Sequence, residues 1–130
     1  MHELATTVAG LPLRLRWVCL GDDLCLILSG GEEHIGAAAV AQPRPSLADP
    51  ARTSATASVI TLPGHKEDIL ARELSLKVAS ALNAAVCVVC GIHMHNPTPA
   101  MLEELLEASR SLIDIFLEKR HSTAQLQGIS

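Results

Sequence analysis

Aromatic residues are almost absent from this chain: Trp17 and Phe116 are the only two among 130 residues. Single-stranded nucleic acids are usually held by bases stacked on aromatic side chains, so the composition argues against that function. Basic residues are also few, with ten Lys and Arg against fourteen Asp and Glu, for a formal net charge of −4. A basic footprint for duplex nucleic acid is therefore lacking, and we expect no nucleic-acid partner.

Long hydrophobic runs are lacking as well. The longest, "IGAAAVA" and "AAVCVVCGI", are shorter than the roughly 18 residues that a membrane span needs. The first residues carry Glu3 and no Lys or Arg before the apolar stretch, unlike a signal peptide. We therefore expect a soluble, cytoplasmic protein with no membrane partner, whose four cysteines (Cys19, Cys25, Cys87 and Cys90) are reduced.

What is present is a high hydrophobic content, 48%, in a chain long enough to bury its own core. We expect one domain over residues 1–130, with its core at about 13–120. Residues 43–57, "PRPSLADPARTSATA", predict a long mobile connection, and residues 121–130 a frayed tail.

The hydrophobic pattern predicts four strands, a helix, a strand and a final helix, in the order ββββαβα. The ranges are 13–20, 24–29, 35–42 and 58–62 for the strands, 66–82 for the helix, 84–91 for the fifth strand and 99–120 for the last helix. A run of strands followed by helices indicates an α+β fold, with a mainly antiparallel sheet and both helices on one face. The apolar run 84–91 is typical of a strand buried on both faces. An apolar domain of this size also predicts a homodimer or higher oligomer.

Histidines follow glycines at three predicted strand ends, in "SGGEEHIG", "LPGHKED" and "CGIHMHN". If these ends converge at one rim of the sheet, His34, His65, His93 and His95 could together bind a divalent metal such as Zn, Fe, Mn or Ni. His93 and His95 would share a face if the strand continues through them. The alternative is that they are polar residues scattered at loop ends, since no established metal fingerprint is present.

Two of these segments could also bind an anion. The free N–H groups of a helix start at Gly64–His65, with Lys66 beside them, attract phosphate, and Gly30–Gly31 could present backbone N–H groups in a nest. The alternative is that these glycines only allow tight turns. Asn96 could belong to the same cofactor-binding set, or could only serve a turn or a cap. The acidic residues near these turns could act as acids or bases, or could simply be solvated: Glu32, Glu33, Glu67 and Asp68.

Taken together in this order, "GGEEHIGAAAVA", "LPGHKEDILARELS" and "VVCGIHMHNPTPAMLEELLE" resemble the prenylated-flavin chaperones, the LpdD-like proteins. These are accessory proteins of UbiD-type decarboxylases. The resemblance covers most of the chain, from about Leu13 to Leu117, and leaves out the segment 43–57. It implies a non-catalytic helper that binds prenylated FMN, or FMN, and aids maturation of the decarboxylase.

Position by position, the resemblance implies that His34, His65 and His93 match the family's histidines. Gly64 and Lys66 match its helix-opening turn and Asn96 its turn after the strand. The position of His95 more usually carries Asp in the family, which leaves room for a changed metal or cofactor preference.

Three readings of the function therefore remain open. The first is a cofactor chaperone that grips the flavin phosphate, directly or through a histidine-held metal. The second is a metal-dependent hydrolase or lyase for a small anionic substrate, with His34, His65 and His93 as ligands and Glu33 or His95 as the base. A structural module without a ligand is the third, simpler reading.

Overall fold

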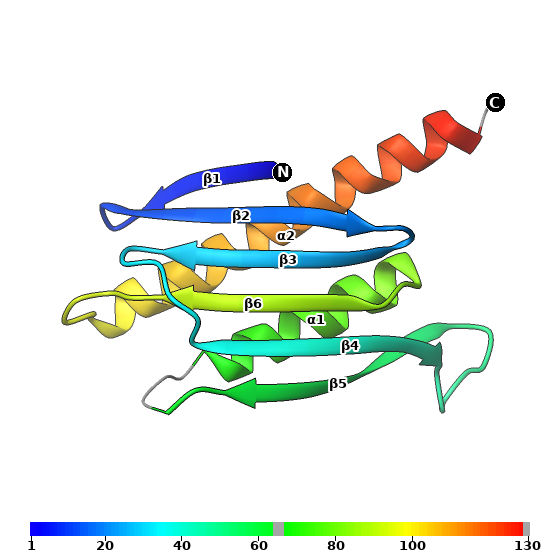
Figure 1. Cartoon of the computed structure of the whole chain (residues 1–130), viewed down its shortest axis with the longest axis horizontal. Helices are drawn as coiled ribbons and strands as arrows, with labels where there is room; N and C mark the ends of the chain where they lie inside the picture. Colours follow the sequence, from blue (N-terminus) through cyan, green and yellow to red (C-terminus); the bar gives the residue numbers. More distant parts are fainter. Residues whose placement is uncertain (64–66, 129–130) are drawn as a thin grey trace.

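The structure is a computed structural model that describes residues 1–63 and 67–128, and of residues 123–128 only the backbone. Figure 1 shows one sheet in front of two helices. The strands are β1 (His2–Val8), β2 (Leu11–Leu20), β3 (Asp23–Gly30), β4 (Ala37–Pro45), β5 (Thr53–Thr61) and β6 (Val86–Ile92), and the helices are α1 (Asp68–Leu82) and α2 (Pro99–Gly128).

The six strands lie in the order β1-β2-β3-β6-β4-β5. Every neighbouring pair is antiparallel except β3 and β6, which run parallel. Both helices cover the same face of the sheet (Figure 1). The predicted fold class, an α+β fold with a mainly antiparallel sheet and two helices on one face, is confirmed. The predicted element order lacked one strand, because β1 was not anticipated.

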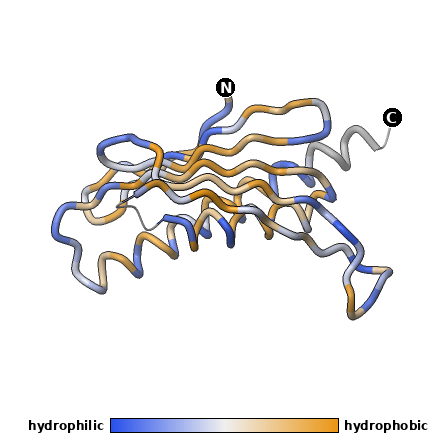
Figure 2. Tube along the Cα trace, turned by 60° about the horizontal axis from the view of Figure 1, so that its bottom comes forward, coloured by the Kyte–Doolittle hydropathy of each residue, from blue (hydrophilic) through white to orange (hydrophobic). Residues whose placement is uncertain are grey.

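The core lies between the sheet and the helices, and alternation along each strand places it there. In β2, Leu13, Leu15 and Trp17 are buried against the helices, while Arg14 and Arg16 point to the other face. In β4 the inward positions are alanines, which let α1 pack closely against the strand. Figure 2 shows the same organisation as hydrophobic strands joined by hydrophilic turns.

The helices contribute the apolar stripes that the sequence predicted. Leu70, Leu74 and Val78 of α1 are buried, as are Leu105, Leu112, Ile113 and Phe116 of α2. Phe116 meets the edge of Trp17, with ring centroids 4.9 Å apart, so the two core aromatic rings join α2 to the sheet. Within the described residues, no helix is long and apolar enough to cross a membrane.

Two predictions about the connections are wrong. The segment 43–57 is not a long connection, because β4 and β5 pair through Pro43↔Ala55 and Pro45↔Thr53, which leaves a turn at 46–52. Both prolines lie past Ala41, where β4 stops pairing with β6, so each is tolerated without the N–H that a central strand needs. The last helix does not end at Arg120 but continues to Gly128, and residues 129–130 of the predicted tail lie outside the described residues. Its predicted start is confirmed, since Oγ1 of Thr98 accepts a hydrogen bond from the N–H of Met101 at 3.1 Å.

Candidate ligand-binding cavity

A cavity of about 490 Å³ opens where the start of α1, the end of β6 and the start of α2 meet. Its volume falls in the range of small-molecule sites. Eight of its thirteen lining residues are apolar, which gives it a hydrophobic wall and a polar remainder. The lining consists of Ile69, Leu70, Ile92, Met94, Pro97, Leu102, Leu105 and Leu106, together with His34, Glu67, Glu73, His93 and Arg110.

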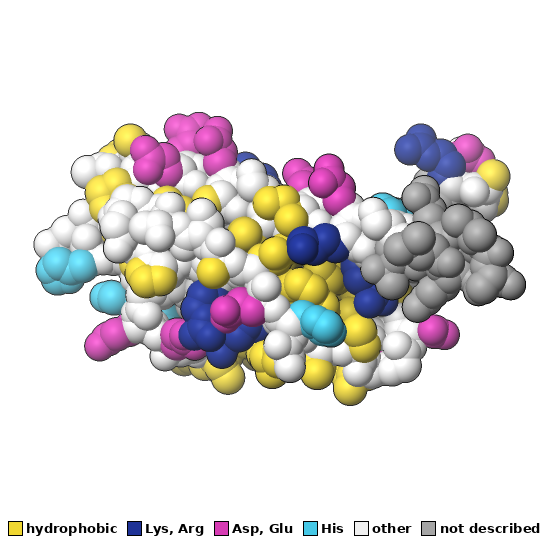
Figure 3. All heavy atoms as spheres, turned by 90° about the horizontal axis from the view of Figure 1, so that it is seen from above, with side chains coloured by type: hydrophobic (Ala, Val, Ile, Leu, Met, Phe, Trp, Pro, Cys, Tyr) yellow, Lys and Arg dark blue, Asp and Glu magenta, His cyan; other side chains and the backbone are white. Residues whose placement is uncertain are grey.

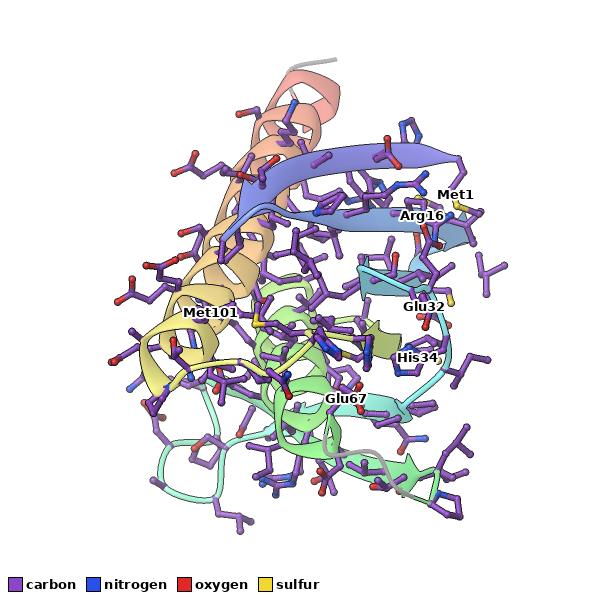
Figure 4. All side chains as sticks on the ribbon, turned by 90° about the vertical axis from the view of Figure 1, so that its left-hand side faces the viewer. Met1, Arg16, Glu32, His34, Glu67 and Met101 are labelled. Carbon is purple, nitrogen blue, oxygen red and sulfur yellow. The ribbon has the colours of Figure 1, made fainter. Side chains whose placement is uncertain are left out.

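An ion pair between His34 and Glu67 forms part of the polar remainder. Nε2 of His34 lies 3.2 Å from Oε1 of Glu67, and the N–H of Ile92 donates to the same oxygen at 3.3 Å. Figure 4 shows Glu67, just before α1, and His34, in the segment between β3 and β4, turned toward one another. Both side chains are largely covered, at 25% and 13% exposure, so water screens their interaction only in part.

The second ring nitrogen of His34 is also engaged. Nδ1 lies 2.9 Å from the carbonyl oxygen of Glu32, which can only accept a hydrogen bond. A ring with an acceptor at each nitrogen is best satisfied as the doubly protonated imidazolium. The bond to the Glu32 carbonyl and then the bond and charge of Glu67 raise the pKa of His34, against the opposing effect of burial. The cavity wall therefore favours the protonated ring of His34, and coordination of a metal would require one of these bonds to break.

Two glycines allow this arrangement. The Glu67 carboxylate lies where a Cβ on Gly36 would be, and the His34 carbonyl lies where a Cβ on Gly91 would be. The segment between β3 and β4 crosses the end of β6 at this point, since β6 lies between those two strands. The N–H of Gly36 donates to the Cys90 carbonyl at 2.9 Å, which holds the crossing against the strand. Only glycine fits such close approaches of side chain and backbone.

The structure brings together some of the sequence-predicted residues and separates others. His34 and His93 both line the cavity, whereas His95 is exposed and does not. Asn96 has a φ of 45° in an exposed turn, the conformational role that was one of its two readings. The N–H of Gly31 donates to the Pro12 carbonyl at 3.4 Å, so that amide already has a partner in the fold. Gly30 belongs to the end of β3 and accepts a bond from the N–H of His93 at 3.0 Å.

The remaining predicted residues, Gly64, His65 and Lys66, lie outside the described residues. Within residues 1–63 and 67–128, no three His, Cys, Asp or Glu side chains are grouped so as to hold a metal ion. The proposed metal site therefore depends on His65 for any third ligand.

Sequence reasoning missed most of the cavity wall. Helical spacing places Leu102, Leu105 and Leu106 on the core stripe of the last helix, yet Leu102 is 45% and Leu106 36% exposed. Ile69, at 75% exposure, faces the same hollow from α1. Arg110 was not singled out, yet it joins the two helices at the cavity through paired bonds of 2.7 and 2.9 Å to Glu73. The apolar stripes of the two helices are wider than the sheet can cover, and this width was the signal that could have indicated the apolar lining residues.

The fold and the cavity define a small α+β domain with an apolar-walled cavity at one end of its sheet. By sequence, the chain belongs to the prenylated flavin chaperone LpdD-like domain family, whose model matches residues 7–121. This confirms the resemblance given by the three motifs. No curated protein matches the chain significantly. Among solved structures, it is similar to a chain from "Crystal Structure of a Novel Chaperone Complex for Yeast 20S Proteasome Assembly", with a TM-score of 0.49 and 14% identity over 88% of this chain and 94% of that chain.

Proposed function

We propose that the chain binds prenylated FMN in the cavity between α1, β6 and α2 and passes it to a UbiD-type decarboxylase, without catalysing a reaction itself. The observation that carries the proposal is the cavity wall, apolar over eight of thirteen residues, in a chain of the prenylated flavin chaperone family. A prenylated flavin is a flat, largely apolar ring system joined to a dianionic phosphate. It needs a hydrophobic wall and a cationic or N–H-rich end.

The apolar part of the ligand accounts for side chains that the protein alone leaves uncovered. Ile69, Leu102 and Leu106 are large hydrophobic residues exposed to the cavity from two different helices. Apolar surface gathered in this way is unfavourable in water and commonly marks a binding site. A bound ring system would cover all three, and burial of apolar surface contributes about 25 cal/mol for each Å² removed from water.

The phosphate, in this proposal, lies at the start of α1. The residue before the helix, Glu67, makes no side-chain capping bond, so the first N–H groups of α1 are not capped by it. Glu67 carries the charge that would oppose a phosphate, and its pairing with His34 offsets that charge to the extent that the ring is protonated. Gly64, His65 and Lys66 directly precede Glu67 in the sequence, and Lys66 would add positive charge there. His65 would hold a divalent metal there, which would supply further positive charge for the phosphate.

The proposal is tested by the melting temperature of the protein with three ligands: prenylated FMN, FMN and riboflavin. Prenylated FMN and FMN are expected to raise the melting temperature, and riboflavin, which lacks the phosphate, is expected to raise it less. Repeating the titration with a chelator separates direct phosphate binding from binding through a metal. If neither phosphorylated flavin changes the melting temperature at millimolar concentration, the proposal fails.

Delivery to the decarboxylase is tested separately. Loaded protein is mixed with cofactor-free UbiD-type decarboxylase, and decarboxylation is followed over time. Activity is expected to appear faster than with the same amount of free prenylated FMN. Equal rates would remove delivery from the proposal and leave only binding.

A further inference from the structure

The cavity lining is polar at two places, with apolar side chains between them. The first is Glu67, just before α1, with its partner His34. The second is Glu73 with Arg110 of α2 beside it, and α1 rises about 9 Å along its axis between positions 67 and 73. The apolar lining precedes Glu73 and Arg110 along the two helices: Ile69, Leu70, Leu102, Leu105 and Leu106. A ligand that fills the cavity therefore meets a second polar group, which the proposed phosphate site does not use.

Glu73 and Arg110 form one of two ion pairs that join the helices. In the other, Nζ of Lys77 lies 2.6 Å from Oδ1 of Asp114. Each member lies four residues beyond its counterpart, so the two helices run in the same direction (Figure 1). Both pairs are partly exposed and screened by water, so each contributes little to stability. Of the two pairs, only Glu73 and Arg110 line the cavity, and the other already joins the helices outside it.

Glu73 and Arg110 keep hydrogen-bonding capacity beyond their own pair. Nε and Nη2 of Arg110 donate to Oε2 and Oε1 of Glu73. A guanidinium carries five N–H groups, and within the part of the chain that the structure describes Arg110 makes no other hydrogen bond, so three remain. The bonds from Arg110 lower the pKa of Glu73, which keeps its carboxylate ionised and able only to accept. The pair thus presents an acceptor and several donors side by side at the cavity.

The charge around this pair does not suit an anion. Glu103, Glu104 and Glu107 are exposed on the same stretch of α2. Figure 3 shows acidic side chains on the side of the molecule that the helices cover, at the top of that view. The negative charges of Glu73 and Glu107 both act on Arg110. A phosphate at Arg110 would therefore meet two carboxylates, whereas a neutral group with both N–H and C=O would find a partner for each.

We propose that Glu73 and Arg110 bind the imide edge of the flavin ring, which carries one N–H between two carbonyl groups. The Glu73 carboxylate accepts a hydrogen bond from the flavin N3–H, and Arg110 donates to a carbonyl oxygen beside it. This inference rests on the flavin binding proposed above and goes beyond it by fixing the orientation of the ring. The imide edge lies toward Glu73, and the phosphate lies toward the start of α1. Hydrogen bonds to charged groups are strong enough to select a flavin that can donate from N3.

The test compares FMN with 3-methyl-FMN, in which a methyl group replaces the hydrogen on N3. The prenyl group of the modified cofactor is attached at N5 and C6 and leaves the imide edge unchanged, so FMN serves as the probe. Isothermal titration calorimetry of the wild type is expected to show at least about tenfold weaker binding of 3-methyl-FMN, because its N3 cannot donate to Glu73. Equal affinity for the two flavins would overturn recognition of the imide edge and leave the proposed flavin binding intact. If the wild type binds neither flavin, flavin binding fails, and the recognition of the imide edge fails with it.

Substitution of Glu73 separates the hydrogen bond from a simple lack of room for the methyl group. Glu73→Ala is expected to weaken the binding of FMN at least about tenfold and to leave that of 3-methyl-FMN nearly unchanged. Asp114→Ala is the matched control, because it breaks the neighbouring ion pair between the same helices outside the cavity. It should keep the wild-type affinity for both flavins. Both side chains lie partly in solvent, so circular dichroism should show both variants folded.

Two results in the variants would overturn the assignment of Glu73. Unchanged binding of FMN together with tighter binding of 3-methyl-FMN in Glu73→Ala would show that the carboxylate only crowds the methyl group. An equal loss of FMN affinity in Glu73→Ala and Asp114→Ala would show that the ion pairs act through the spacing of the helices and not through contact with the flavin.

Discussion

The carboxylate of Glu67 occupies the space beside Gly36 that any larger residue would fill, and from there it reaches both His34 and the backbone of Ile92. The pairing of Glu67 with His34 thus depends on a glycine, which has no side chain, at position 36 in the connection between β3 and β4. Gly36→Ala should displace Glu67 and separate it from His34. NMR titration should then show a lower pKa for His34 than in the wild type, as should Glu67→Gln, which removes the charge without adding a methyl group. An unchanged His34 pKa in both variants would contradict the pairing.

The His34 interactions should make stability depend on pH. The folded protein raises the pKa of His34 above its ordinary value of about 6.5, so folding favours the protonated ring. This contribution is fully present below that ordinary pKa and is lost as the pH rises through the folded pKa. In urea unfolding, the difference in stability between the wild type and His34→Gln should therefore shrink as pH rises above 6.5. A difference that grows with pH would contradict the assignment.

The fold also raises the pKa of the Cys90 thiol, and here burial is the main cause. Burial, and secondarily the charge of Glu67, raise the pKa of its thiol to about 12. Because the thiolate forms more readily in the unfolded chain, stability should fall as pH rises above the ordinary thiol pKa. In the native protein at pH 8.5, Cys90 should resist iodoacetamide while the exposed Cys19 reacts, as mass spectrometry can show. Rapid modification of Cys90 without unfolding would show that the end of β6 is not closed as described.

The contact between Phe116 and Trp17 should be a large contributor to stability. Phe116 is fully buried, so Phe116→Ala should lower the free energy of unfolding by about 3–5 kcal/mol, and Phe116→Leu by less. Trp17 is the only tryptophan, so its fluorescence reports this contact directly during urea unfolding. A loss under about 1 kcal/mol in the alanine variant would mean that α2 does not depend on this contact.

Much of the fold could be predicted from the sequence because the signals are local. The stripe of Leu70, Leu74 and Val78, and the Thr98 cap before Pro99, each indicate a helix within a few residues. By contrast, β1 reads "HELATTV", an edge strand with five exposed positions, and therefore lacks the strict alternation that would predict it. The pairing of β4 with β5 beyond Ala41 was not predicted, because prolines at 43 and 45 argue against a paired strand. They are tolerated because β4 no longer pairs with β6 beyond Ala41.

The cavity was harder to predict because its wall comes from three elements far apart in sequence. The histidine motifs drew attention to the end of the sheet where the cavity opens, and His34 and His93 line that cavity. The partner of His34, however, is Glu67, whose position depends on a close approach to Gly36 that sequence spacing does not reveal. Likewise, Leu102 and Leu106 look like the core leucines of α2 in the sequence. They differ only in their exposure, because the sheet does not cover them.

The central claim, that prenylated FMN binds in this cavity, is tested most directly by titrating the ligand into two variants of the same helix. Leu102→Glu places a charge on the cavity wall, whereas Ile115→Glu changes a residue of similar exposure, 42% against 45%, outside the lining. We predict that Leu102→Glu weakens binding of prenylated FMN at least about tenfold, while Ile115→Glu binds as the wild type does. Equal affinity of both variants and the wild type would contradict the account.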